Sequence, residues 1–205
     1  MLTVEERARA AASAELRSRA VEIDRDRRYP AENLATLSKD GLAGLLVPEE
    51  HGGHGGTLSD LVAVTEALGW GCASTAMCYL MHACGTAVIA AKATKEQGER
   101  WLRPAANGDA IATLAFSERG TGAHFYAPEI TATSKNGSFI LSGRKSFVTS
   151  GGHASLYPVL VNATDGDGLD VIVVTPEMRG VAFDGAWDGI GMAGNSSIAM
   201  LLTEV

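Results

Sequence analysis

Two short clusters of glycine and hydroxyl side chains are the part of this sequence best suited to hold a ligand. They occupy residues 117–123 (SERGTGA) and 147–152 (FVTSGG). Glycine lets a backbone approach a ligand closely because it has no Cβ. Successive backbone N–H groups in such turns can also form a concave anion site. We therefore predict that the two clusters meet around one ligand that carries an anionic group.

The sequence before the clusters has the periodicity of amphipathic helices. Thr3 with Glu6, and Thr94 with Gln97, have the spacing of capping boxes at two helix starts. Apolar residues recur at helical intervals between these points. We expect helices over residues 4–28, 31–38, 57–68, 74–93 and 95–106.

Near Asp109 the pattern changes to short apolar or alternating segments separated by turn residues. Asn136-Gly137 favours a hairpin turn, because both residues accept a positive φ, and residues 165–168 (DGDG) predict a second hairpin loop. The expected strands are 111–116, 129–133, 138–141, 145–149, 156–161, 169–175, 181–183 and 198–202.

This order of elements predicts an α+β fold. An N-terminal α-helical domain over residues 1–109 precedes an antiparallel β-barrel or sandwich domain over residues 110–205. The second domain would carry both ligand clusters on one face.

The composition excludes several classes of function. Hydrophobic residues make up 46% and charged residues 20% of the 205 residues, which is typical of a folded protein. The net charge is -7, and the one basic cluster, at Arg25, Arg27 and Arg28, is interrupted by aspartates, so a nucleic-acid partner is not expected. Residues 70–93 are weakly apolar and contain polar side chains, which favours a buried helix over a membrane span.

Cysteine and histidine spacing gives no metal or disulfide framework. The three cysteines, Cys72, Cys78 and Cys84, are odd in number and unsuited to a zinc site, so we expect reduced thiols and a cytoplasmic location. His51 and His54 are two ligands where a zinc site needs more, and we interpret them as loop histidines.

Four segments together resemble one protein family. They are residues 45–56 (LLVPEEHGGHGG), 115–123 (AFSERGTGA), 142–151 (SGRKSFVTSG) and 187–197 (WDGIGMAGNSS). In this order and spacing they resemble the N-terminal helical and middle β domains of the acyl-CoA dehydrogenase family, and the resemblance extends over nearly the whole chain.

The resemblance implies that FAD is the ligand of the two clusters. Thr149 matches the threonine at the N5 edge of the flavin, and Phe147 stands where the family usually has a tryptophan beside the isoalloxazine ring. Ser117 matches the hydroxyl residue at the pyrimidine end, and Phe116 lies beside it. A structural alternative for Ser117 and Thr149 is turn capping at strand ends.

Gly122 and Ala123 match the pair that meets the pyrophosphate in the family. Ala123 replaces the usual serine, so only backbone N–H groups remain there. Arg119 replaces the usual proline, and its charge could compensate beside a pyrophosphate or CoA. His124 and Ala193 replace the usual aspartate and arginine.

Further residues have both a functional and a structural interpretation. Ala123 and Thr75 are candidate substrate contacts, Thr75 toward the acyl chain, with ordinary packing as the alternative for Thr75. His82 could line an acyl pocket, but a hydrogen-bonded core histidine is favoured. Glu118 resembles a catalytic acid, but its family counterpart shapes the loop, so we favour a structural role.

The resemblance implies α,β-dehydrogenation of an acyl-CoA thioester with hydride transfer to FAD. In the family, a C-terminal helical domain supplies the glutamate base, and this sequence stops where that domain would begin, so no residue is assigned as the catalytic base. The implied partners are an acyl-CoA substrate, an electron-transferring flavoprotein or similar acceptor, and further subunits of an oligomer.

Two alternatives remain open. The replacement at Ala123 is compatible with a flavin-dependent monooxygenase of the acyl-CoA dehydrogenase-like group. The length is compatible with a non-catalytic chain that pairs with another subunit or is a remnant of an enzyme.

Overall fold

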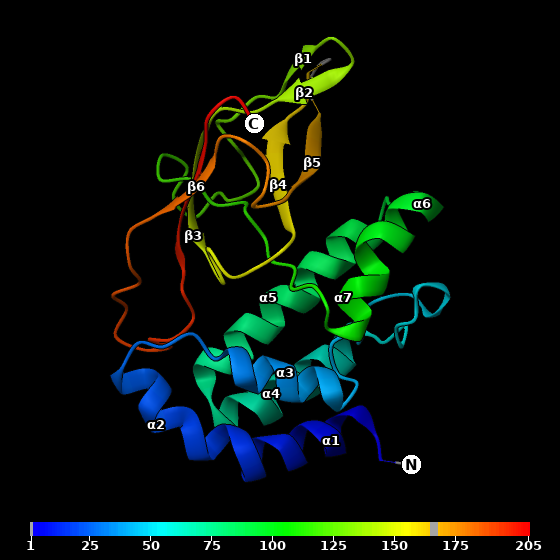
Figure 1. Ribbon diagram of the computed structural model, residues 1–205, viewed down its shortest axis with the longest axis vertical. Helices are drawn as coiled ribbons and strands as arrows, with labels where there is room; N and C mark the ends of the chain where they lie inside the picture. The colour runs from blue at the N-terminus through cyan, green and yellow to red at the C-terminus, as the bar shows by residue number, and fades with distance from the viewer. Residues whose placement is uncertain (1, 165–167) are drawn as a thin grey trace.

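The chain folds into a helical part followed by a sheet-bearing part, with the two termini at opposite ends (Figure 1). This computed structural model describes residues 2–164 and 168–205. The hairpin loop predicted at residues 165–168 lies largely outside the described residues. The α+β fold class is confirmed.

The first predicted helix forms as one helical run with a wider turn inside it. The run consists of α1 (Val4–Ala11), a π-helical segment η1 (Ala12–Leu16) and α2 (Arg17–Arg25). The predicted capping box is present, since the Thr3 hydroxyl accepts from the Glu6 N–H and the Glu6 carboxylate accepts from the Thr3 N–H. The run ends before Arg27, whose φ of 50° leaves the helical region.

The remaining helices surround α5, the longest one. They are α3 (Ala31–Lys39), the 3-10 turn η2 (Glu49–His51), α4 (Leu58–Gly71), α5 (Ala73–Ala90), α6 (Lys95–Gln97), the π-helical segment η3 (Gly98–Leu102) and α7 (Arg103–Asn107). By length and composition alone α5 could cross a membrane. Here it contributes Cys78 and Tyr79 to the core of the helical part, together with Leu37 and Leu42.

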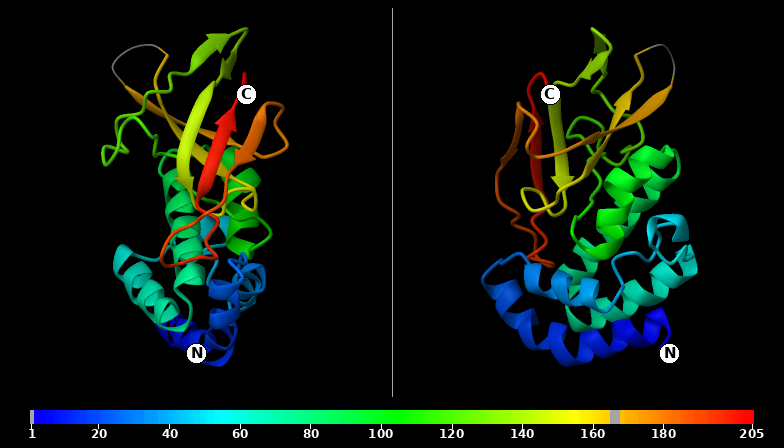
Figure 2. Two further views of the ribbon diagram at one scale, coloured as in Figure 1. Left: turned by 90° about the vertical axis from the view of Figure 1, so that its left-hand side faces the viewer. Right: turned by 45° about the vertical axis from the view of Figure 1, so that its right-hand side comes forward.

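The strands form small antiparallel sheets. They are β1 (Thr133–Lys135) with β2 (Ser138–Ile140), β3 (Gly143–Val148) with β7 (Ile198–Leu202) and β6 (Val181–Asp184), and β4 (Tyr157–Asn162) with β5 (Leu169–Val174). Figure 2 shows β7 lying between β3 and β6. The predicted hairpin is confirmed, because Asn136 and Gly137 have φ of 54° and 77° between paired β1 and β2.

The segment predicted as a strand at 111–116 is not a strand. It lies beside β4 through isolated parallel bridges at Ala112 and Ala115, and its far side faces α5. Gly85 of α5 allows this approach, since a Cβ there would lie 3.0 Å from the Ala112 Cβ. Within the predicted strand at 129–133, Thr131 forms an isolated bridge and Thr133 begins β1, which continues beyond the predicted end. These segments and the sheets share one core, which includes Tyr157.

The helical part ends with α7 at Asn107, and the first bridged residue of the sheet part is Ala112. The predicted boundary at residue 109 lies in this short stretch, and the domain limits stay a prediction.

Candidate functional site

The structure brings the two predicted clusters together. The backbone N–H of Ser146 donates to the carbonyl of Ser117 with an N–O distance of 2.7 Å. The first cluster therefore lies against the end of β3, where the second cluster begins at Phe147. A common ligand for the two clusters requires this proximity.

A buried ion pair connects the first cluster to β3, the strand that leads into the second cluster. Lys145 Nζ lies 2.5 Å from Glu118 Oε1, and the two side chains are 0% and 3% exposed. Lys145 also donates to the carbonyls of Leu160 and Phe116, and Glu118 accepts from the Glu129 N–H at 2.8 Å. Burial lowers the pKa of Lys145, while the bond to Glu118 acts in the opposite direction. The predicted structural role of Glu118 is confirmed.

Phe147 projects from a bulge in β3. The register between β3 and β7 shifts between Lys145 and Val148, and Phe147 has a φ of 55°. A bulky residue in this conformation is rare and persists only where its surroundings impose it. The ring is 68% exposed. The bulge therefore turns an aromatic ring outward at the point where the clusters meet.

The sequence did not predict the second aromatic ring that lies next to Phe147. Trp187 lies edge-on to it, with centroids 6.4 Å apart and planes at 87°. Trp187 belongs to the segment before β7 and is separated from Phe147 by forty residues of sequence (187 − 147). The sequence signal available was an aromatic residue at the start of the fourth family segment.

The Thr149 hydroxyl is bound within the chain. Thr149 is 2% exposed, and its Oγ1 lies 2.9 Å from the Ser197 Oγ. Ser197 is held in turn by its N–H, which donates to Asn195 Oδ1 at 2.9 Å. The Thr149 hydroxyl therefore bonds another side chain and not the backbone of a turn, and its contact with a flavin stays a prediction. The run of small polar residues at 195–197 was the available signal for these partners.

The other predicted cofactor residues are accessible. Phe116 and Ser117 are half-buried, and Gly122 and Ala123 are exposed. Gly122 has a φ of 55°, and, apart from its chain neighbours, no atom of the described residues lies within 4 Å of the position that a Cβ would take. These two residues thus present backbone to solvent on the loop that follows Ser117.

Two residues of α5 lie in the core instead of on an open face. Thr75 is fully buried and accepts a hydrogen bond from Asn33 Nδ2 at 2.9 Å. Its predicted contact with an acyl chain stays a prediction. His82 Nε2 lies 2.9 Å from the Ala43 carbonyl, and His82 Nδ1 accepts from the Ala112 N–H at 3.1 Å. The interpretation of His82 as a hydrogen-bonded core histidine is confirmed.

The two loop histidines point to different partners. His51 Nδ1 lies 3.2 Å from Glu99 Oε1, whereas His54 Nε2 lies 2.6 Å from the Gly41 carbonyl. Each ring therefore supports the local loop structure.

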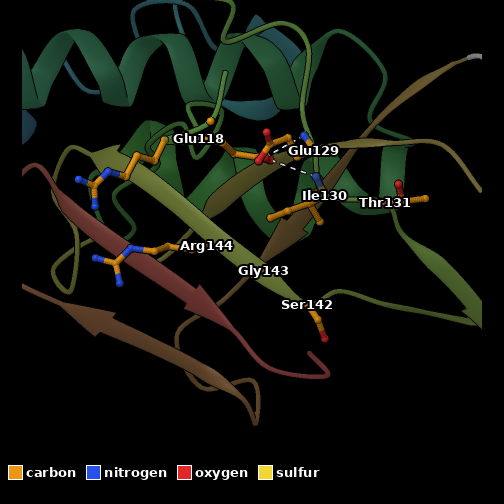
Figure 3. Close-up of a pocket in the computed structure, with 9 residues that line it drawn as sticks. Glu118, Glu129, Ile130, Thr131, Ser142, Gly143 and Arg144 are labelled. Carbon is orange, nitrogen blue, oxygen red and sulfur yellow. Dashed lines mark hydrogen bonds between the residues drawn. The ribbon is translucent and has the colours of Figure 1, made fainter. Parts of the chain in front are cut away.

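A cavity of about 440 Å³ is lined partly by residues of the first cluster. None of the predicted cofactor residues is among its lining residues. It is lined by residues 118–120, 129–131 and 142–144. Figure 3 shows the Glu118 carboxylate directed at the backbone N–H groups of Glu129 and Ile130, and Arg144 extending from β3. Arg144 is paired with Asp184 at 3.0 Å. Glu118, a member of the buried ion pair, therefore forms part of the cavity wall.

Comparison with known families places the whole arrangement. Residues 2–109 match the acyl-CoA dehydrogenase N-terminal domain, and residues 113–205 match the acyl-CoA dehydrogenase middle domain. The chain belongs to the acyl-CoA dehydrogenase family. The resemblance inferred from the four segments is therefore confirmed for both domains.

Several relatives extend over almost all of this family member. Acryloyl-CoA reductase (NADH) of Anaerotignum propionicum is 31% identical over 203 residues, which are 96% of this chain and 51% of that protein. The human mitochondrial short-chain specific acyl-CoA dehydrogenase is 28% identical and matches 90% of this chain and 46% of its own length. The chain thus spans about half the length of these relatives.

Solved structures share the fold. Butyryl-CoA dehydrogenase from Megasphaera elsdenii superposes with a TM-score of 0.90 at 23% identity, covering 100% of this chain and 57% of that one. An acyl-CoA dehydrogenase from Bacillus anthracis, complexed with FAD, superposes with a TM-score of 0.87 at 21% identity, covering 98% of this chain and 35% of that one.

Proposed function

We propose that this chain is the N-terminal portion of an FAD-dependent acyl-CoA dehydrogenase that introduces an α,β double bond into an acyl-CoA thioester. The observation that carries the proposal is the meeting of the two clusters at the Ser117–Ser146 hydrogen bond, in a chain of this family. Activity of the whole protein is part of the proposal, because the chain spans about half of its relatives.

The exposed residues fit an isoalloxazine ring. Phe147 offers an outward-facing aromatic ring held by a bulge, which suits packing against a flat cofactor. Ser117 and Phe116 would lie at the pyrimidine end. Because Ser197 already binds the Thr149 hydroxyl, Thr149 would contact the N5 edge through its backbone. FAD, when bound, supplies the two-electron acceptor of the reaction.

The loop after Ser117 fits a pyrophosphate. Gly122 and Ala123 are exposed, and the Cβ position at Gly122 has no atom within 4 Å from the part of the chain that the structure describes, its two chain neighbours aside. Their backbone N–H groups would bind the pyrophosphate, and Arg119, also exposed, would add a positive charge. Ala123 would also contact the acyl-CoA. Thr75, which is fully buried, would lie beneath the surface that the acyl chain contacts.

Proton removal is assigned outside these residues. Glu118, the carboxylate of the first cluster, is buried and paired with Lys145, so we assign it a structural role and not that of the base. We propose that the base that removes the α-proton lies in a C-terminal domain of the longer protein. That domain would also form subunit contacts, and an electron-transferring flavoprotein would accept the electrons.

A second candidate is the reverse reaction, reduction of a 2-enoyl-CoA. It is favoured by the 31% identity to acryloyl-CoA reductase (NADH). Phe147 and the loop at Gly122 and Ala123 would serve either direction of the reaction, because both directions use the same cofactor and a CoA thioester.

The test is flavin binding and substrate-dependent bleaching. The longer protein that contains these 205 residues, purified without added flavin, should show flavin absorbance that bleaches when a short acyl-CoA is added. NADH-dependent loss of enoyl-CoA absorbance would instead favour the reductase. A protein that neither retains FAD nor binds it on titration would overturn the proposal.

A matched pair of variants assigns the cofactor surface. Phe147→Ala should weaken FAD binding about fivefold, because an aromatic contact of this kind is worth about 1 kcal/mol. Phe139, 51% exposed on β2, is the control residue, and Phe139→Ala should bind FAD as the parent does. Equal effects of the two variants would contradict the assignment.

A further inference from the structure

A second cavity, here called the crevice, lies where the helical part contacts the sheet part. Its volume is about 250 Å³. Arg27 and Tyr29 line it from the link between α2 and α3, and His153 lines it from the turn that follows β3. Trp187 and Ser196 line it from the segment before β7, which descends to the end of α2 (Figure 1). None of the residues predicted to bind FAD or the acyl-CoA lines this crevice.

One wall of the crevice is a pair of stacked rings. Tyr29 and His153 have centroids 4.0 Å apart and planes within 2° of parallel. The Tyr29 hydroxyl donates to the Ser150 Oγ at 3.1 Å, which fixes the tyrosine across the contact between the two parts. Burial lowers the pKa of His153, which favours the uncharged form of its ring. The wall therefore offers flat, uncharged aromatic surface.

Hydrogen-bond donors accompany this wall. The Nε1 of Trp187 is buried and has no acceptor in the part of the chain that the structure describes. Because this nitrogen is buried, it lies out of reach of a ligand in the crevice, and the accessible donor is Arg27. Arg27 donates to the Trp187 carbonyl at 3.1 Å and pairs with Asp188 at 2.8 Å. A guanidinium has five N–H donors, so Arg27 can bind further acceptors.

We propose that this crevice binds a small planar carboxylate, of the class of benzoate. A flat aromatic wall selects a flat ring, and the guanidinium selects acceptor oxygens. No carboxylate lines the crevice among the described residues, and the side chain of Asp188, which pairs with Arg27, is 88% exposed. Because both halves of the chain contribute, the ligand also holds the two halves together.

The experiment uses benzoate as the probe, with cyclohexanecarboxylate as the non-planar control of the same charge. Benzoate should give a saturable change in tryptophan fluorescence and raise the melting temperature of the chain, both without FAD and with FAD present. Cyclohexanecarboxylate should bind about tenfold more weakly, since it cannot stack. Equal affinities, or no saturable response to benzoate, would overturn the proposal.

Variants identify the crevice as the site. Trp187→Phe keeps an aromatic ring but removes the indole fluorophore, and should abolish the fluorescence change. His153→Ala should weaken binding while retaining the fluorescence of Trp187. Trp70→Phe is the control, because Trp70 lies on α4 under Arg17 and far outside the crevice lining. Full benzoate affinity in His153→Ala would overturn the proposal, whether or not the protein binds FAD.

Discussion

Lys145 and Glu118 form an ion pair in which neither side chain is more than 3% exposed. The pair joins β3 to the loop that carries the first cluster, so the geometry of the predicted cofactor surface depends on it. Removing one member of a buried pair leaves an uncompensated charge, which is far more costly than removing both.

The first prediction concerns this pair. Lys145→Met should destabilise the protein by about 3–5 kcal/mol, because the Glu118 carboxylate is left buried without its partner. The double variant Lys145→Met with Glu118→Gln should recover part of the loss. Urea unfolding measures both.

The control for this prediction is an exposed ion pair between Arg144, the residue before Lys145 on β3, and Asp184 on β6. Arg144 and Asp184 are 51% and 57% exposed. Arg144→Ala should therefore change the free energy of unfolding by no more than about 1 kcal/mol. If Lys145→Met were as mild as Arg144→Ala, the ion pair would not hold the loop as described.

The second prediction concerns pH and His82. Burial lowers the pKa of His82 from its ordinary value of 6.5, and its two ring nitrogens are bound by Ala43 and Ala112. As the pH falls below 6.5, the unfolded chain takes up a proton at His82 that the folded chain does not. The free energy of unfolding should then fall by up to about 1.4 kcal/mol per pH unit.

His82→Gln tests this origin. Glutamine has a donor and an acceptor but does not titrate, so the variant should be less stable at pH 8 and show a shallower decline below pH 6.5. His153 contributes a decline of the same sign, since burial lowers its pKa too. The difference between the two curves therefore isolates His82, and parallel curves would refute the prediction.

The sequence predicted the helices, the hairpin and the family segments because each depends on local signals. The capping box at Thr3 and the turn at Asn136-Gly137 need only neighbouring residues. The strand expected at 111–116 failed because its alternation reflects burial between α5 and β4, contacts that lie far away in sequence.

The candidate site was predictable only in part, for the same reason. Ser117 and Phe147 stand in segments with recognisable residues, and their proximity follows from pairing at the end of β3. Ser197 as the partner of Thr149, and Trp187 as the neighbour of Phe147, depend on how the segment before β7 folds back. No local periodicity encodes these contacts.

The third prediction concerns the helix crossing at Gly71. A Cβ at this position would lie 2.8 Å from the Ala12 carbonyl oxygen and 2.9 Å from its Cα. Both are backbone atoms, so Gly71→Ala should separate α4 from η1 and cost about 1–3 kcal/mol. Gly69→Ala on the same helix is the control, since its nearest contact would be ordinary, at 3.9 Å from the Ala76 Cβ. Thermal unfolding should show a loss for the first variant and none for the second.

The fourth prediction concerns the Thr149–Ser197 hydrogen bond. Ser197→Ala removes the partner of a buried hydroxyl and should lower the free energy of unfolding by about 1–3 kcal/mol. Thr149→Val with Ser197→Ala, which replaces both hydroxyls by apolar groups, should be closer to the parent. If Thr149 contacts the flavin through its backbone alone, Thr149→Val with Ser197→Ala should retain FAD and its absorption spectrum. Loss of FAD from this double variant, with normal stability, would instead assign the hydroxyl to the cofactor.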